Sequence, residues 1–111
     1  MKIAIKNDRE LRIIQTDLLL AVTADGASCK FHFEEMSSFT SSHSLTKIHL
    51  ALPENFIKIK KDCIININFV RSIDFRKREV VLTEKKEIKF KFSTRNASVL
   101  KNAFKDLKSL D

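Results

Sequence analysis

The chain has 111 residues, 43% of them hydrophobic, and a formal net charge of +7 at pH 7. This length predicts one domain over residues 1–111, and the apolar content excludes a chain that stays unfolded. The longest apolar run, Leu18–Val22, is far too short to span a bilayer. No long apolar segment of a secretion signal follows Met1, so we expect a cytoplasmic protein without a membrane partner.

The charge is unevenly distributed along the chain. Residues 1–55 carry six Lys or Arg against seven Asp or Glu, a net charge of −1, whereas residues 56–111 carry fifteen against seven, a net charge of +8. This concentration of charge predicts a basic face for a polyanion such as nucleic acid. A solvated basic surface that binds nothing anionic is the alternative.

Short strands are predicted throughout the first half of the chain. Five segments have the alternating or apolar pattern of a strand: 2–6, 11–14, 18–22, 29–33 and 36–40. Those at 11–14 and 18–22 are apolar enough to be buried on both faces. The only Gly follows Asp25, a pair typical of a hairpin, so residues 23–28 are predicted to form a turn.

The β pattern resumes after residue 53. The predicted strands of the second half are 57–60, 63–69, 72–75, 80–83 and 87–92. Polar breaks separate them, among them the basic turn Arg76-Lys77-Arg78 and a hairpin tip at 84–86.

Two helices are predicted, near 45–52 and near 94–108. The first has apolar residues at i, i+3 and i+7 and ends at Pro53. The second can be capped by Ser93 and has its own apolar stripe. The fold class is therefore mainly β, with about nine strands in small antiparallel sheets, a short internal helix and a C-terminal helix.

Motifs of catalysis or metal binding are absent from the sequence. It has no Gly-rich phosphate loop, no GxSxG and no HExxH, so we do not expect an enzyme. The two cysteines, Cys29 and Cys63, are far apart, and the three histidines have no ligand spacing. We expect no cofactor and no metal.

The most specific signal is an ordered set of residues from Leu52 to Asn66: Leu52-Pro53, Phe56, Lys58-Ile59, Lys60-Lys61, Asp62 and Ile64-Ile65-Asn66. Further segments fit the same pattern in the same order: Asp17–Leu19, Ala24–Gly26, Phe69–Ile73, Glu79–Thr83 and Phe92–Asn96. Together they resemble the LytTR-type DNA-binding domain of bacterial transcription regulators, from about Ile13 to Leu107.

This resemblance implies an elongated, mainly β fold whose loops, rather than a recognition helix, bind double-stranded DNA at one edge. The loops enter successive major grooves of a promoter with repeated half-sites, and the DNA bends. Arg95 is expected to bind a guanine edge, and Lys60 and Lys61 to bind phosphates. An ion pair with a nearby carboxylate is the alternative for Arg95. The positions that match are the loop Asp25–Cys29, the bend Lys60–Asp62 and Arg95. The residues expected to bind DNA are Ser28, Cys29, Lys30, Lys58, Lys60, Lys61, Arg95 and Asn96.

The resemblance also implies a response regulator of a two-component system. The chain either stands alone or is the DNA-binding part of a longer regulator, with a receiver domain or another regulator as its partner. We expect a monomer or weak dimer in the free state, and two copies on DNA about one helical turn apart.

Two alternatives to DNA binding remain. The family usually has His-Arg-Ser where this chain has Lys60-Lys61-Asp62, and phosphate repels the carboxylate of Asp62. A LytTR-like module that sequesters another regulator is therefore the first alternative. An RNA-binding β module that stacks bases on Phe side chains is the second.

Overall fold

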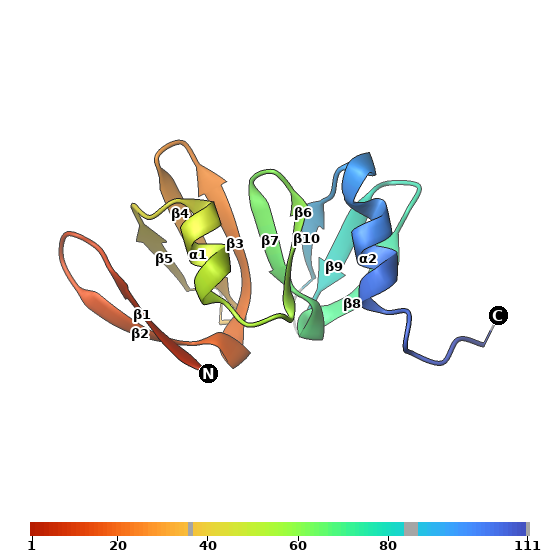
Figure 1. Ribbon diagram of the computed structural model, residues 1–111, viewed down its shortest axis with the longest axis horizontal. Coiled ribbons are helices and arrows are strands. Elements are labelled where there is room, and N and C mark those ends of the chain that lie inside the picture. Colours follow the sequence, from red (N-terminus) through yellow and green to blue (C-terminus); the bar gives the residue numbers. More distant parts are fainter. Residues whose placement is uncertain (36, 84–86, 111) are drawn as a thin grey trace.

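The computed structural model describes residues 1–35, 37–83 and 87–110. Within them the chain forms short antiparallel sheets and two short helices, arranged in an elongated body of 50 × 25 × 23 Å (Figure 1). The helices are α1 (Leu45–Ala51) and α2 (Ala97–Ala103). The strands are β1 (Lys2–Lys6), β2 (Leu11–Gln15), β3 (Leu19–Asp25), β4 (Ser28–Phe33), β5 (Ser38–Ser41), β6 (Phe56–Lys60), β7 (Cys63–Asn66), β8 (Val70–Asp74), β9 (Glu79–Leu82) and β10 (Ile88–Lys91). The mainly β prediction is confirmed, with ten described strands in place of about nine.

Three sheets make up the described structure. β1 and β2 form a hairpin, β8, β9 and β10 form a meander, and the central sheet has the order β5-β4-β3-β7-β6. Every described strand pair is antiparallel. All of these pairs join strands that are consecutive in the chain, except the pair of β3 with β7. That pair sets Val22 opposite Ile64 and attaches the β6–β7 hairpin to the first half of the chain.

The central sheet separates two apolar cores. Successive side chains of a strand point to opposite faces, so Val22 and Ile64 join the core that contains α1 and the first hairpin. Ala21 and Ile65 join the core beneath β8–β10 and α2. The prediction that residues 18–22 are buried on both faces is confirmed for Leu19–Val22, each fully buried.

The same prediction is wrong for residues 11–14. Leu11 and Ile13 are 62% and 57% exposed, because the β1–β2 hairpin packs only one of its two faces against the core. Leu18, in the 3₁₀ turn after β2, is also exposed, so the core does not absorb all the apolar residues.

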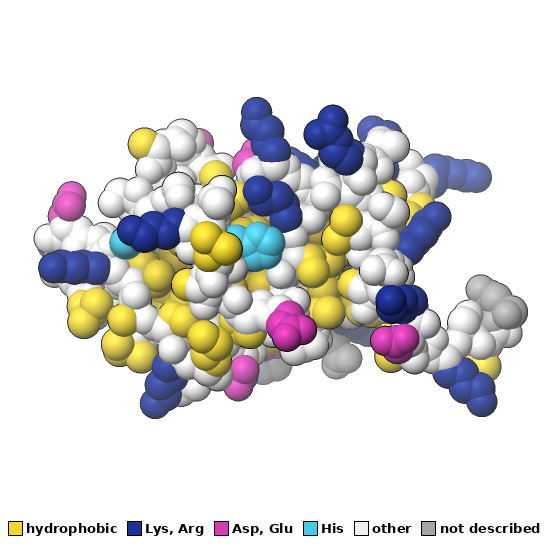
Figure 2. All heavy atoms as spheres, viewed as in Figure 1, with side chains coloured by type: hydrophobic (Ala, Val, Ile, Leu, Met, Phe, Trp, Pro, Cys, Tyr) yellow, Lys and Arg dark blue, Asp and Glu magenta, His cyan; other side chains and the backbone are white. Residues whose placement is uncertain are grey.

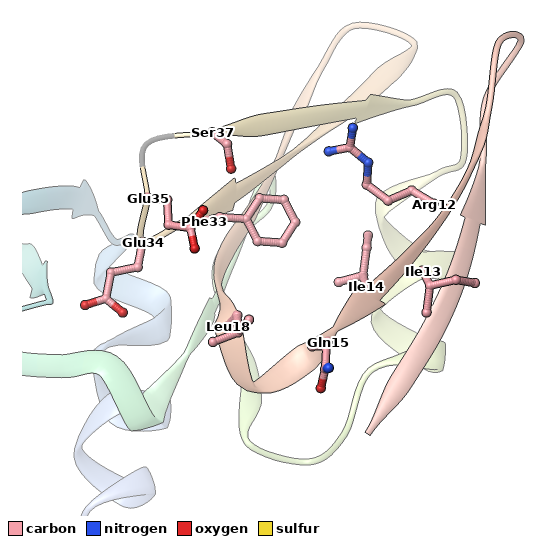
Figure 3. Close-up of a pocket in the computed structure, with 9 residues that line it drawn as sticks. All are labelled: Arg12, Ile13, Ile14, Gln15, Leu18, Phe33, Glu34, Glu35 and Ser37. Atoms are coloured by element: carbon pink, nitrogen blue, oxygen red, sulfur yellow. The ribbon is translucent and has the colours of Figure 1, made fainter.

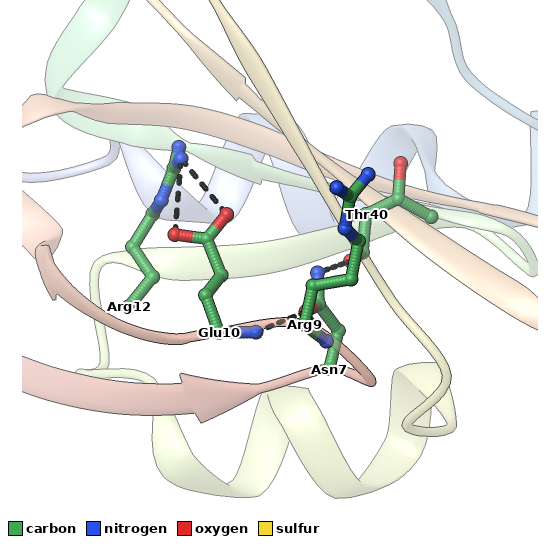
Figure 4. A network of polar contacts seen from close by, with 5 residues as sticks. All are labelled: Asn7, Arg9, Glu10, Arg12 and Thr40. Atoms are coloured by element: carbon green, nitrogen blue, oxygen red, sulfur yellow. Dashed lines mark hydrogen bonds and ion pairs between the residues drawn. The ribbon is translucent and has the colours of Figure 1, made fainter.

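A polar network fixes the tip of this first hairpin (Figure 4). Asn7 Oδ1 accepts hydrogen bonds from the backbone N–H groups of Arg9 and Glu10, both at 2.9 Å. Its amide donates to the carbonyl of Thr40 in β5 at 3.1 Å. Arg12 pairs with Glu10 at 3.3 Å. The tip is therefore tied to the edge of the central sheet.

Several predicted boundaries differ from the structure. The strand predicted at 63–69 ends at Asn66, whose side chain accepts from the backbone of Asn68 and starts a 3₁₀ turn over Ile67–Phe69. The helix predicted at 94–108 begins with a 3₁₀ turn over Thr94–Asn96, and its α-helical part ends at Ala103. The chain past Ala103 lacks a core to pack on, and Leu107 is 68% exposed.

Other differences concern turns. The turn predicted at 23–28 is confined to residues 26 and 27, because β3 and β4 pair up to Asp25 and Ser28. Of the strand predicted at 36–40, Met36 lies outside the described residues, as does the hairpin tip at 84–86. Ser44, rather than Ser42, caps α1 by accepting from the backbone of Lys47.

His32 lies where the central sheet meets the β8–β10 meander. Its Nε2 is 2.8 Å from Thr23 Oγ1, and its ring makes an edge contact with Phe90, with centroids 5.4 Å apart. Burial lowers the pKa of His32 below its ordinary value of 6.5, and the charge of Lys30 lowers it further.

We therefore expect the protein to lose stability in mild acid. A depressed pKa means that the unfolded chain binds the proton more tightly, so the stability is full above about 6.5 and falls as the pH drops through that value. The denaturation midpoint, followed by circular dichroism from about pH 7 to about pH 5, reports this loss. A His32→Gln variant should flatten the profile in that window; an unchanged profile would exclude His32 as its source.

Candidate nucleic-acid interface

The β3–β4 turn is the first of three loops at one edge of the molecule. Gly26 has φ +62°, a left-handed conformation that Gly adopts at low cost, which lets a two-residue turn join paired strands. Ser28 Oγ donates to the Asp25 carbonyl at 3.3 Å. Lys30 is exposed, whereas the side chain of Cys29 is buried in the core, where burial raises the pKa of its thiol.

The β6–β7 bend is the second loop. Lys60 pairs in register with Cys63, so Lys61 and Asp62 form the turn. Lys60 Nζ and Asp62 Oδ1 are 3.6 Å apart, and both side chains are partly exposed. The Asp62 carbonyl accepts from the backbone N–H of Ala24 at 2.9 Å, which ties the bend to β3.

Cys63 lies directly beneath this bend and is 1% exposed. Burial raises the pKa of its thiol to about 12; Lys60 lowers it and Asp62 raises it by smaller amounts. The thiol is therefore protonated at neutral pH and serves the core rather than any chemistry at the surface.

The junction between β10 and α2 is the third loop. The backbone N–H of Ser93 donates to the Ile59 carbonyl at 3.0 Å, which anchors the junction to β6. Ser93 Oγ donates to Asn96 Oδ1 at 2.6 Å and accepts from the Asn96 backbone at 3.3 Å. Arg95 is exposed in the middle of this turn. No carboxylate of the described residues pairs with it, which disfavours the ion-pair alternative.

The second and third loops enclose an open cleft. The residues that line it are Lys58, Lys60, Lys61, Asp62, Ser93, Arg95 and Asn96. In Figure 1 the β3–β4 turn, the β6–β7 bend and the start of α2 all lie along the upper edge. Figure 2 shows Lys and Arg side chains projecting along this edge, right of the centre.

The structure thus brings together five of the eight predicted site residues in one cleft: Lys58, Lys60, Lys61, Arg95 and Asn96. Ser28 and Lys30 lie on the neighbouring β3–β4 turn and strand, and Cys29 faces the core. Asp62 and Ser93 were not predicted as site residues, yet both line the cleft. Both lie in segments that fit the family pattern, and this resemblance, together with the expected cap at Ser93, is the signal that could have placed them there.

A different cavity lies between β2 and the end of β4 (Figure 3). Its apolar floor includes Ile14 and Phe33, and its rim includes the carboxylates of Glu34 and Glu35. Among the described residues that line it, Arg12 is the one cation and already pairs with Glu10, so this cavity does not suit a polyanion.

Metal sites and membrane-spanning helices are two further features that residues 1–35, 37–83 and 87–110 could contain. No cluster of three or more His, Cys, Asp or Glu side chains could hold a metal ion there. No helix in this part of the chain is long and apolar enough to cross a membrane.

Comparisons with known proteins identify the family and the fold of the chain. The family model described as the LytTr DNA-binding domain matches residues 9–105. A solved structure described as the LytTr DNA-binding domain of a methyl-accepting/DNA response regulator from Bacillus cereus has a similar fold, with a TM-score of 0.74 and 19% sequence identity. The match covers 93% of this chain and 95% of that one. A search of curated proteins finds no match. The family model spans most of the sequence, so the chain belongs to the LytTR family of DNA-binding domains.

Proposed function

We propose that the whole chain, residues 1–111, acts as the sequence-specific DNA-binding domain of a bacterial transcription regulator. The cleft between the β6–β7 bend and the β10–α2 junction is the observation that carries the proposal. It gathers four cations: Lys58 and Lys60 in β6, Lys61 in the bend and Arg95 in the junction. Backbone hydrogen bonds fix the bend and the junction to the central sheet. Loops held on a rigid scaffold suit recognition of a duplex of fixed geometry.

The two sides of the cleft have different tasks in this proposal. Arg95 and Asn96 enter a major groove, where an Arg fork binds a guanine edge and an Asn amide binds an adenine edge. Lys58, Lys60 and Lys61 bind phosphates beside that groove. The β3–β4 turn, with Ser28 and Lys30, enters the next groove.

Selection from a pool of random duplexes tests this function. The protein should enrich duplexes with a common sequence repeated about one helical turn apart, because two copies bind one face of DNA. The affinity for a selected duplex should fall steeply with salt. If neither selected nor mixed-sequence duplex is bound at low salt, DNA binding in the cytoplasm is not the function of this chain.

Replacing Lys60 or Lys61 by Ala should weaken binding to selected and mixed duplexes alike. The slope of log K against log salt is negative, and each lost phosphate contact should make it less steep by about 0.9. Fluorescence anisotropy over a salt series measures this slope. Lys2→Ala is the matched control, because Lys2 is an exposed lysine of β1, away from the cleft. A loss confined to the selected duplex would instead assign these lysines to base recognition.

A protein-interaction module is the second candidate function, and Asp62 favours it. Its carboxylate lies in the cleft and pairs with Lys60, which reduces the positive charge there. Such a module would bind another regulator rather than DNA. The selection experiment separates the two, since an interaction module enriches no duplex.

A further inference from the structure

The basic turn between β8 and β9 is a feature that the cleft does not include. It carries three consecutive cations, Arg76, Lys77 and Arg78, all exposed. In Figure 1 the β8–β9 connection reaches the same upper edge as the start of α2, on the side away from the β3–β4 turn. Its position relative to Arg95 decides whether it can meet the same DNA.

Hydrogen bonds hold the backbone of this turn in place. Asp74 Oδ1 accepts from the Lys77 backbone N–H at 2.9 Å. The Lys77 carbonyl accepts from Lys91 Nζ at 3.1 Å, and the Arg78 carbonyl accepts from the Phe92 backbone at 3.0 Å. The rings of Phe75 and Phe92 meet edge to face beneath it, with centroids 5.9 Å apart.

One side chain connects the turn to the β10–α2 junction. Arg78 Nη1 donates to Thr94 Oγ1 at 3.3 Å, and Thr94 immediately precedes Arg95. The Arg78 backbone has φ +55°, a left-handed conformation unfavourable for a residue with a side chain. The bonds to Phe92 and Thr94 hold Arg78 in that conformation, so the turn and the junction form one unit.

The side chains of the other two cations, Arg76 and Lys77, form no hydrogen bond with the residues that the structure describes. Two carboxylates flank the turn: Asp74 is bonded to the Lys77 backbone, and Glu79 pairs with Lys91 at 3.7 Å. No carboxylate among the described residues forms an ion pair with Arg76 or Lys77. Arg76 and Lys77 are therefore exposed cations on a fixed backbone beside the junction that carries Arg95. They are placed to bind an extended anion that lies along this junction. The sugar-phosphate backbone that borders the groove has this chemistry.

We propose that Arg76 and Lys77 are additional phosphate contacts, on the flank of the groove that receives Arg95 and opposite to the flank held by Lys60 and Lys61. This inference rests on the proposed DNA binding and extends it to a part of the fold outside the cleft. Arg78 acts as a positioning residue that fixes the turn to Thr94. The sugar-phosphate backbone is bound without regard to sequence.

The test compares two double variants with the same change in charge. Arg76→Ala with Lys77→Ala removes the proposed contacts while leaving the backbone hydrogen bonds of the turn in place. Lys105→Ala with Lys108→Ala is the control, because both lysines are exposed near the chain end that leaves α2 at the lower edge in Figure 1. Thermal melting checks that both variants fold.

In the first double variant the slope of log K against log salt should be less steep by about two units, close to 0.9 per contact. The change should be the same on a selected duplex and on a mixed-sequence duplex. The ratio of the two affinities should stay unchanged, and the control should keep the slope of the intact protein. Ethylation interference supplies a second readout: phosphates on one flank should matter for the intact protein and not for the variant.

An unchanged slope, or an equal loss of slope in the control, overturns this inference and leaves the proposed function standing. A change in the ratio of affinities would also overturn it, because it would assign the turn to base recognition. An intact protein that binds no duplex overturns both the inference and the proposed function.

Discussion

Replacing Arg95 by Ala should cost about 1–3 kcal/mol of binding free energy on a selected duplex and little on a mixed-sequence duplex. The reason is geometric: Arg95 is exposed in a turn fixed by Ser93 and Asn96, and no described carboxylate competes for its guanidinium. A planar fork on a fixed backbone can form two hydrogen bonds with one guanine edge. The loss should therefore concern sequence preference more than charge.

Arg95→Lys is the matched variant, because it keeps the charge and removes the fork. It should lose nearly as much affinity as the Ala variant on the selected duplex, and nothing on the mixed duplex. Anisotropy titrations at one fixed salt concentration give both values. If Arg95→Ala binds its selected duplex unchanged, the base-reading role belongs to another residue.

Replacing Asn66 by Ala should lower the free energy of unfolding by about 2–4 kcal/mol. Asn66 is 1% exposed at the end of β7 and joins three parts of the fold. Its amide donates to the Leu19 carbonyl at 3.0 Å, and its Oδ1 accepts from Asn55 Nδ2 at 2.8 Å and from the Asn68 backbone at 2.9 Å. Alanine leaves the Leu19 carbonyl without its partner in the buried interior, and it also removes the two half-buried hydrogen bonds to Asn55 and Asn68.

Chemical denaturation measures this loss, and Asn68→Ala is its control. Asn68 is two residues away and exposed, and it contributes only its backbone N–H to the network. Its replacement should change stability by less than about 0.5 kcal/mol. Equal losses in the two variants would show that the 3₁₀ turn over Ile67–Phe69, rather than the buried amide, is what matters.

Much of the fold follows from periodicity in the sequence. Alternation predicts β1 and β10, and the apolar spacing before Pro53 predicts α1. Periodicity does not show which other elements pack on a strand. It therefore predicts Leu11 and Ile13 to be buried, although β2 pairs only with β1 and both side chains are exposed. The helix predicted at 94–108 is longer than the observed α2, because periodicity does not show where packing against the core ends.

The candidate site was predictable in part, through the family resemblance rather than through charge. Basic residues recur along the whole second half, and nothing local separates Lys60 and Lys61 from Lys101 or Lys105. Nor does the sequence show that the turn at 76–78 lies beside Thr94, because a hydrogen bond across a folded meander makes them neighbours.

The pairing of β3 with β7 has a consequence for how the chain folds. Each of the other described strand pairs forms between neighbours in the sequence, at a small cost in loop entropy. Val22 and Ile64, by contrast, must meet across the intervening β4, β5, α1 and β6. Hairpins that form independently should thus wait for this non-local contact, which makes β3–β7 docking the slow step of folding. Both cores, and the edge that gathers the basic loops, come into existence at that step.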